Sequence, residues 1–577
     1  MLQEVSAANR IELPWLHGGD LVARQLASEG VDLLFTLTGG HISPIYDGLR
    51  HVGVRLVDFR HEQAAVHAAD AYARICRKPA VAALTAGPGV TGGVTAIANA
   101  LYARSPVVVL GGRNPFAIDG AGNLQEAPQL ELLKPITKNV AGIHHFTRIP
   151  DILRDAFARA FTPRYGPAYV DIPMDVLLTR SDAADAPALI KPPYLAEGHP
   201  RNSDVKKIAQ LLGAAQRPVV LVGTGAYWDN AEHALSSFVE IYKAPVYLNG
   251  MARGLLGRNN PYVVSKGRKS ALAKADLVLA LGIDFDFRLD YGQLIAPEAQ
   301  IIQVDPDTPS LGRNRSVMIG VPTSTVAFLT ELLQIDGLFG RSISSRWLDD
   351  LKASEQQSRH KQQEAVKSGR QSPIHPMRLC AEVAEYLDED AVVVGDGGDI
   401  VSAYASVHRA GKPGHWMDPG PFGCLGVGAP FAMGARLARP QEQVAVIFGD
   451  GAFGFNGFEY DSAVRAKLPF VGILGNDGAW GEMRTFHADL FGSRDLSAQH
   501  LSQDTRYEKV VEALGGFGRR IEDAEDIRPA LDEAFASGVP ALLNVILDPT
   551  YQRRNESVSG RLVAQAYGGD HNAFRRD

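Results

Sequence analysis

The sequence predicts an α/β protein with three doubly wound, parallel-sheet domains. Short apolar runs rich in β-branched residues alternate with amphipathic, alanine-rich stretches along most of the chain, which is the pattern of βαβ units. The chain has 577 residues, too many for one hydrophobic core. The alternation recurs in three blocks without an exact sequence repeat.

The first two blocks are separated by a linker. Residues 1–180 contain the apolar runs DLLFTL, RLVDF, AVAALTAG, PVVVLGG and PAYVDIP. Residues 181–200 are rich in Pro, Ala and Asp and have no sustained period, which predicts a linker. Residues 201–340 repeat the pattern with PVVLVG, APVYLN, ADLVLALG and AQIIQVD, and they predict a central domain.

The third block follows a charged segment. Residues 341–372 are rich in charged residues and predict a solvated helical connector. Residues 373–549 predict the third domain, which opens with the strand AVVVGD and closes with PALLNVILD. Residues 550–577 are polar and Arg-rich, and we expect either a disordered end or a lid over a site.

The composition excludes several classes of protein. A net charge of −7 gives no basic surface for nucleic acid. Cys76, Cys380 and Cys424 are too far apart for a disulfide framework or a zinc site, which fits a reducing cytoplasm. The N-terminus lacks a secretory pattern, and no stretch of about 18 apolar residues could span a membrane. We therefore expect a cytoplasmic protein with no nucleic-acid or membrane partner.

Two polar turns in the third block suggest a cation site. The apolar run 444–448 ends at Gly449-Asp450-Gly451, and the run 470–474 is followed by Asn476-Asp477-Gly478. Because parallel strands end at the same edge of a sheet, Asp450 and Asn476, 26 residues apart (476 − 450), can converge with the carbonyl of Gly478. Such an oxygen set suits Mg2+, with water and phosphate completing the octahedron. Gly and Asp are also common in turns that only close a βα unit.

Taken together, these turns resemble the signature of thiamine diphosphate enzymes, Gly-Asp-Gly followed after about 25 residues by Asn. That family usually has Asn-Asn where Gly475-Asn476 stands here, and only the second Asn is the expected metal ligand. The resemblance implies thiamine diphosphate and Mg2+ as cofactors. It also implies a pyrimidine-binding first domain, a central domain and a diphosphate-binding third domain.

The first domain, with DFRHEQAAVHAADAYAR and TAGPGVTGGVTAIANA, is similar to the pyrimidine-binding domain of the acetolactate synthase superfamily. In that family the glutamate after the second strand bonds the aminopyrimidine and promotes formation of the reactive ylide, which here is Glu62. An acidic residue in the first turn of a helix is also favoured by the helix dipole alone. Family members place the two cofactor domains of different subunits together, so Glu62 and Asp450 should meet in a homodimer at least, with a homotetramer as the expected assembly.

The same resemblance implies further cofactor contacts. The Gly423 carbonyl would accept from the aminopyrimidine, and Leu425 would bend the cofactor in place of the usual methionine. Gly87-Pro88-Gly89 is not a nucleotide P-loop because no GKS or GKT follows it, which favours a tight turn. The expected cofactor residues beyond Glu62 are Gly87, Asn99, Gly397, Gly398, Asp399, Gly423, Leu425, Gly449, Asp450, Gly451, Ala452, Asn476, Gly478 and Ala479.

The central domain invites a nucleotide interpretation. Gly223-Thr224-Gly225 follows a strand, but the third glycine of a dinucleotide fingerprint is missing. By resemblance this domain would hold the adenine nucleotide part of CoA or ADP, with FAD as the weaker alternative. Arg253, Arg258 and Arg288 are the phosphate candidates, and ordinary surface arginines are the alternative.

The segments TLTGGHISPI, NLQEAPQLELLKPITK, NGMARGLLGRNNP, DFRLDYG and FGDGAFGFNGFE most resemble the branch that contains 2-hydroxyacyl-CoA lyases. The expected reaction cleaves an acyl-CoA such as 2-hydroxyisobutyryl-CoA to formyl-CoA plus an aldehyde or ketone, in either direction. Acetolactate synthesis from pyruvate and an oxalyl-CoA-type decarboxylation are the alternatives.

Two departures from acetolactate synthases bear on the substrate. Glu482 places a carboxylate where synthases present apolar side chains, and we expect it to be the general base. His41 places an ionisable ring where synthases have a small or apolar residue, and it is a catalytic candidate, although a lone histidine often only forms hydrogen bonds. The expected substrate-binding residues are Gln125, Trp480, Arg253, Arg258, Arg288, Arg553, Arg554 and Arg561.

Overall fold

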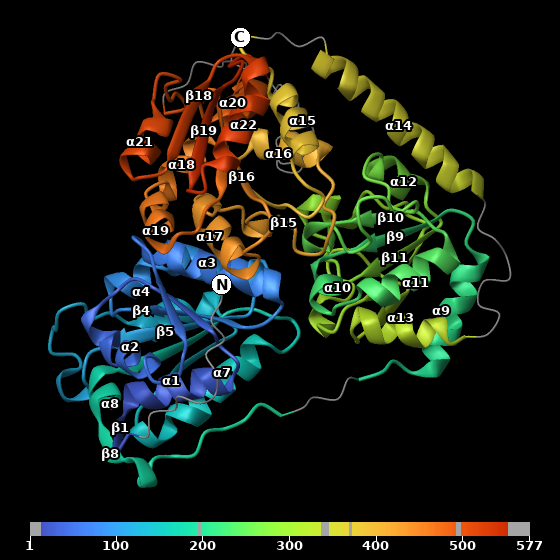
Figure 1. The fold of residues 1–577 in the computed structure, drawn as a ribbon. Coiled ribbons are helices and arrows are strands. Elements are labelled where there is room, and N and C mark those ends of the chain that lie inside the picture. Colours follow the sequence, from blue (N-terminus) through green and yellow to red (C-terminus); the bar gives the residue numbers. More distant parts are fainter. Residues whose placement is uncertain (1–12, 194–197, 336–344, 368–371, 492–497, 552–577) are drawn as a thin grey trace. The chain divides into compact units, whose positions relative to one another are not determined.

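The computed structural model describes residues 13–193, 198–335, 345–367, 372–491 and 498–551 (Figure 1). The chain divides into two compact units. The first unit comprises residues 1–58, 65–362 and 410–422, and the second comprises residues 59–64, 363–409 and 423–577. Within the described ranges, no helix combines the length and the apolar character that crossing a membrane requires.

The N-terminal sheet of the first unit is parallel, in the order β3-β2-β4-β5-β7-β6. Strand β4 is buried along its whole length, as expected for a sheet with helices on both faces. The strands are β2 (Leu33–Thr36), β3 (Arg55–Asp58), β4 (Ala80–Leu84), β5 (Val107–Arg113), β6 (Asn139–Gly142) and β7 (Ala168–Pro173). The main helices are α1 (Gly18–Ser28), α2 (Ser43–Leu49), α3 (Glu62–Cys76), α5 (Val94–Tyr102) and α7 (Ile149–Ala160).

The central sheet of the first unit is also parallel, in the order β10-β9-β11-β12-β13. Its strands are β9 (Pro218–Val222), β10 (Val246–Leu248), β11 (Leu277–Leu281), β12 (Gln300–Val304) and β13 (Ile319–Val321). Its helices include α9 (Asn202–Ala214), α11 (Glu232–Tyr242), α12 (Arg268–Lys274) and α13 (Thr325–Leu333).

The sheet of the second unit has parallel strands in the order β14-β16-β17-β19-β18. These strands are β14 (Val392–Asp396), β16 (Val444–Gly449), β17 (Val471–Asn476), β18 (Phe517–Ile521) and β19 (Ala541–Ile546). The helices include α15 (Pro376–Tyr386), α16 (Asp399–Val407), α17 (Gly428–Ala438), α18 (Asp450–Asn456), α19 (Glu459–Ala466), α20 (Gly481–Phe491), α21 (Tyr507–Ala513) and α22 (Ile527–Ala536). The predicted α/β class with three parallel-sheet domains is confirmed by the described parts of the chain.

Some short elements differ from the sequence-based expectation. The predicted linker begins inside β8 (Arg180–Asp182), which pairs antiparallel with β1 (Trp15–His17). Strand β6 was also missed. Both β6 and β8 are too short, and too weakly apolar, to show alternation. The charged connector does form a helix, α14 (Ser345–Lys367).

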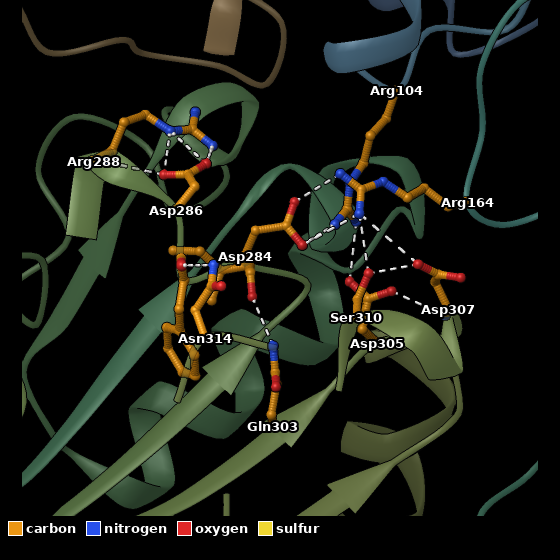
Figure 2. A network of polar contacts seen from close by, with 12 residues as sticks. Arg104, Arg164, Asp284, Asp286, Arg288, Gln303, Asp305, Asp307, Ser310 and Asn314 are labelled. Atoms are coloured by element: carbon orange, nitrogen blue, oxygen red, sulfur yellow. Dashed lines mark hydrogen bonds and ion pairs between the residues drawn. The ribbon is translucent and has the colours of Figure 1, made fainter. Parts of the chain in front are cut away.

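A buried ion-pair network joins the N-terminal and central parts of the first unit (Figure 2). Arg104, just after α5, contacts Asp284 at 2.9 Å and Asp305 at 3.0 Å. Arg164 contacts the other oxygen of Asp284 at 2.8 Å. Burial opposes the charge of Arg104, but the carboxylates of Asp305 and Asp284 outweigh it and hold its pKa above the usual value. Asp305 has no solvent exposure, so its negative charge depends on Arg104 rather than on water for stabilisation.

We expect Arg104→Ala to destabilise the protein by about 3–5 kcal/mol, because it leaves buried Asp305 without the guanidinium that it contacts. The measurement is the midpoint of thermal unfolding. Arg148→Ala is the control, since Arg148 pairs with Asp151 at the surface and its loss should cost at most about 1 kcal/mol. Equal midpoints for the two variants would contradict the expectation.

Candidate active site

Neighbouring strands of the second unit end side by side at one edge of its sheet. Asp396 at the end of β14 lies opposite Phe448 of β16, and Gly449 of β16 lies opposite Gly475 of β17. The turns that follow these strands therefore start next to one another. This is the edge at which the sequence predicted a site.

The turns after β16 and β17 bring the predicted metal ligands together. The backbone N–H of Gly478 donates to Asp450 Oδ2 at 3.0 Å and to Asn476 Oδ1 at 3.2 Å. Gly478 has φ of +66°, which glycine adopts readily. Because one backbone N–H contacts both side-chain oxygens, the Asp450 carboxylate and the Asn476 amide oxygen lie close together and form a candidate cation site.

A buried chain of polar side chains orients Asn476. Its Nδ2 donates to Asn544 Oδ1 at 3.1 Å, and Asn544 Nδ2 donates to Glu508 Oε2 at 2.8 Å. Because Nδ2 is engaged by Asn544, the oxygen of the Asn476 amide is the atom presented to Gly478. The sequence analysis missed Asn544 and Glu508. The available signal was a lone Asn inside the apolar strand β19, where it is fully buried.

The electrostatics at Asp450 favour a bound cation. Burial and the nearby Asp477 carboxylate raise the pKa of Asp450 to about 7, although backbone N–H groups of Gly451, Gly478 and Ala479 partly offset this. Burial and the second carboxylate both destabilise the charged form of Asp450. A neighbouring cation would therefore stabilise this carboxylate.

A cavity of about 320 Å3 lies over these turns. Gly397 and Gly451 bring the backbone close to it: a Cβ on Gly397 would lie 2.9 Å from the Gly449 nitrogen, and one on Gly451 would lie 2.5 Å from the indole of Trp480. The cavity brings together most of the predicted cofactor residues of this unit, namely Gly397, Gly398, Asp399, Gly423, Leu425, Gly449, Asp450, Gly451, Ala452 and Ala479.

The loop that carries Gly423 and Leu425 is anchored from two sides. Gly426 N donates to Asp396 Oδ1 at 3.0 Å, and Gly428 N donates to Asp396 Oδ2 at 2.7 Å. Asn456 Nδ2 donates to the Gly426 carbonyl at 2.6 Å. Burial raises the pKa of Asp396 to about 6, and these backbone donors partly offset the rise. Asp396 therefore holds the loop, a role that the sequence analysis did not assign.

Glu482 lies in the first turn of α20 and lines the same cavity as Trp480. Its carboxylate lies against the turn after β14, because a Cβ on Gly398 would overlap its Oε2 atom. The structure thus brings the predicted general base next to the turns that carry the candidate cation site.

His41 lies at the carboxyl edge of the N-terminal sheet in the first unit. Its Nε2 is 3.1 Å from Asn114 Oδ1, and its Nδ1 is 3.2 Å from Thr85 Oγ1. Asn114 Nδ2 donates to the Leu124 carbonyl at 3.1 Å, so Asn114 Oδ1 is the acceptor. We infer that Nε2 donates to Asn114 Oδ1, while Nδ1 faces the hydroxyl of Thr85.

Gly87 forms the predicted tight turn after β4 in the same unit. It has φ of +57°, and its N–H donates to Gln129 Oε1 at 2.6 Å. A Cβ at this position would overlap the backbone of Gln125, which explains the glycine. Gln125 thus lies beside Gly87, while the buried Gln129 was missed.

Glu62 and Asn99 occupy different environments. Glu62 is the first residue of α3 and its side chain is 17% exposed. Asn99 has no solvent exposure, and its Nδ2 donates to Asp70 Oδ2 at 3.1 Å in the interior of the first unit. A cofactor contact for Asn99 stays a prediction that this burial does not support.

The arginines expected to bind phosphate lie mainly in the central domain. Arg288 pairs with Asp286 at 2.6 Å (Figure 2), and Arg253 lies over the Trp416 ring at 5.1 Å. Arg258 is half-buried. A small cavity of about 30 Å3 lies beside Arg288. ADP and FAD stay predictions. Arg553, Arg554 and Arg561 lie outside the described residues.

The residues of the second unit do fit thiamine diphosphate. The mixed oxygen set can hold the cation that a diphosphate requires, and the glycine turns let backbone N–H groups approach phosphate oxygens. The anchored loop presents Leu425 to the same cavity.

Comparisons with known families agree with this interpretation. Residues 16–132 match the family model described as "Thiamine pyrophosphate enzyme, N-terminal TPP binding domain". Residues 205–332 match "Thiamine pyrophosphate enzyme, central domain", and residues 396–545 match "Thiamine pyrophosphate enzyme, C-terminal TPP binding domain". Thiamine pyrophosphate and thiamine diphosphate are the same compound.

Individual relatives cover nearly the whole chain. "Acetolactate synthase large subunit IlvG" of Mycobacterium tuberculosis is 40% identical over 94% of this chain and 98% of its own length. "2-hydroxyacyl-CoA lyase 2" of Caenorhabditis elegans is 35% identical, and that of Homo sapiens 34%, each over 92% of this chain and 90% of the relative. The chain therefore belongs to the thiamine pyrophosphate enzyme family.

Proposed function

We propose that this protein is a thiamine diphosphate- and Mg2+-dependent carbon–carbon lyase that acts on a 2-hydroxyacyl-CoA such as 2-hydroxyisobutyryl-CoA. The products are formyl-CoA and an aldehyde or ketone, and the reaction can run in either direction. The observation that carries the proposal is the carboxylate of Glu482 in the cavity beside Asp450. The similarity to proteins named 2-hydroxyacyl-CoA lyase 2 supports it.

In this proposal Asp450, Asn476 and the Gly478 carbonyl hold Mg2+, which in turn binds the diphosphate. The Gly478 carbonyl already accepts from Leu501 N at 2.8 Å, and its second lone pair is the one available to a metal. When bound, thiamine diphosphate supplies a nucleophilic carbon that attacks a carbonyl and accepts the electrons of the broken C–C bond. Glu62 hydrogen-bonds the aminopyrimidine.

Glu482 is proposed to remove the proton of the substrate hydroxyl. Cleavage turns the hydroxyl-bearing carbon into a carbonyl, so that proton must leave as the bond breaks. A half-buried carboxylate in a cavity can accept it. His41, held in place by Thr85 and Asn114, is the second catalytic candidate, contributed to the site in a homodimer or homotetramer.

Acetolactate synthesis from pyruvate is the second candidate function, because a relative with that name is 40% identical to this chain. That reaction forms a C–C bond after decarboxylation, and Glu482 would then only line the cavity. An oxalyl-CoA-type decarboxylation likewise gives Glu482 no hydroxyl proton to remove. The role of the Glu482 carboxylate therefore separates the candidates.

We expect Glu482→Gln to lower kcat for 2-hydroxyacyl-CoA cleavage by about 100- to 10,000-fold, since the amide cannot take the hydroxyl proton. Thiamine diphosphate affinity should be unchanged because Glu482 is not a metal ligand in this proposal. Glu512→Gln is the control, since Glu512 pairs with Lys509 at the surface. Unchanged cleavage in Glu482→Gln would contradict the proposal, as would turnover of pyruvate but of no acyl-CoA by the wild type.

A further inference from the structure

Glu459 is a buried carboxylate to which the proposed mechanism gives no role. It is the first residue of α19 and is 1% exposed. Both of its oxygens accept from the backbone N–H of Arg60, at 3.1 Å and 3.2 Å, within the second unit. The backbone N–H of His61 and the hydroxyl of Ser462 also donate to it.

The segment that Glu459 binds lies immediately before α3, and α3 begins at Glu62. The sequence Phe59-Arg60-His61 contains no Ser, Thr, Asp or Asn that could cap this helix in the usual way. His61 Nδ1 accepts from Gln63 N at 3.0 Å, which satisfies one early donor. The donors of residues 60 and 61 need an acceptor from elsewhere in the fold, and Glu459 supplies it.

Burying a carboxylate at this position has a desolvation cost in free energy. Burial raises the pKa of Glu459 to about 7, although hydrogen bonds from Ser462, Arg60 and His61 partly offset the rise. A neutral acceptor would avoid this cost of desolvation. However, the two oxygens of a carboxylate can accept from two successive N–H groups at once, and a negative charge is favoured at a helix N-terminus.

We propose that Glu459 is a positioning residue, which fixes the backbone just before Glu62 and thereby orients the Glu62 carboxyl group toward the aminopyrimidine. This inference rests on the role proposed for Glu62. Small errors in the placement of a catalytic group are costly, since a shift of 1 Å can lower a rate by about 100-fold.

The first test needs no cofactor. Hydrogen–deuterium exchange of the backbone amides of residues 59–64, followed by mass spectrometry in the apo protein, should show protection in the wild type. In Glu459→Gln it should be faster by about tenfold or more, as expected for the loss of charge-assisted hydrogen bonds. Asp461→Asn is the matched control, because the Asp461 carboxylate accepts from the side chains of Arg60, at 3.2 Å, and Arg465, at 3.0 Å, whereas Glu459 accepts from the Arg60 backbone. Unchanged exchange in Glu459→Gln would overturn the inference.

The second test measures exchange of the thiazolium C2 hydrogen with saturating thiamine diphosphate and Mg2+. We expect Glu459→Gln to slow this exchange by about tenfold or more, and to slow it no further in a Glu62→Gln background. A merely structural role would add its effect in both backgrounds. If C2 exchange ran at the wild-type rate in Glu459→Gln but was slow in Glu62→Gln, the inference about Glu459 would be overturned. The role proposed for Glu62 would stand. Wild-type exchange in Glu62→Gln would overturn the proposed role of Glu62, and the amide exchange would still report on the backbone.

A second pair of variants covers the case in which Glu459→Gln does not fold. Arg60→Pro removes the backbone donor to Glu459, whereas Arg60→Ala keeps it and removes only the side chain that contacts Asp461. Slower C2 exchange in Arg60→Pro than in Arg60→Ala supports the inference. Equal rates in the two variants would overturn it.

Discussion

Replacing Asp450 with alanine is expected to weaken Mg2+-dependent binding of thiamine diphosphate by at least ~100-fold, beyond the 10- to 100-fold typical of residues that only support a metal ligand. Asp450 provides the one carboxylate of the proposed ligand set, and Asn476 and the Gly478 carbonyl contribute no negative charge. Binding can be followed by tryptophan fluorescence, because the indole of Trp480 packs against Gly451 in the same cavity. Dialysis against EDTA should release the cofactor from the wild type in the same assay.

Asp526→Ala is the control for that experiment. Asp526 lies in the same unit, and its side chain is 56% exposed with the carboxylate 3.8 Å from Arg519. It should bind the cofactor as the wild type does. If Asp450→Ala retained Mg2+-dependent binding, the metal assignment would be wrong, and the family's usual ligand pattern would not hold in this chain.

Glu62→Gln is expected to keep the fold and to slow exchange of the thiazolium C2 hydrogen by ~100-fold or more. This factor is the lower limit of what a positioned acid or base usually contributes to a rate. The amide has nearly the same shape as the carboxyl group, so thermal unfolding should be unchanged. Nuclear magnetic resonance of the bound cofactor after quenching measures the exchange rate.

Glu131→Gln serves as the matched control, because Glu131 is an exposed glutamate of α6 (Gln129–Leu133). Its exchange rate should equal that of the wild type. A wild-type rate in Glu62→Gln would show that another group assists the cofactor, and His41 would then be the next residue to replace.

The fold and the main turns of the site were predictable because their information is local. Each turn lies directly after a buried apolar strand, so the residues around Asp450 and Asn476 indicate both where each strand ends and which side chains are candidate ligands. The parallel pairing of β16 with β17 then brings the two turns together. A reader of the sequence needs only the periodicity of the strands and the edge rule for parallel sheets.

The supporting residues were not predictable because their partners are distant in the sequence. Asn544 lies 68 residues beyond Asn476 (544 − 476), and Glu459 lies 399 residues beyond Arg60 (459 − 60). No local pattern links such pairs. The same limitation applies to Asn99, because its hydrogen bond to Asp70, 29 residues before it, cannot be read from the local sequence. Tertiary packing decides these roles.

The single carboxylate of the candidate cation site has a thermodynamic consequence. In the proposed site, one negative charge from Asp450 with two neutral oxygens would leave a divalent cation undercompensated, so we expect the protein alone to be a weak chelator. The diphosphate would supply the missing charge, and by linkage each partner would then raise the affinity for the other by the same factor. The occupancy of the site would therefore depend on the product of the free Mg2+ and thiamine diphosphate concentrations. A shortage of either would lower the occupancy of both.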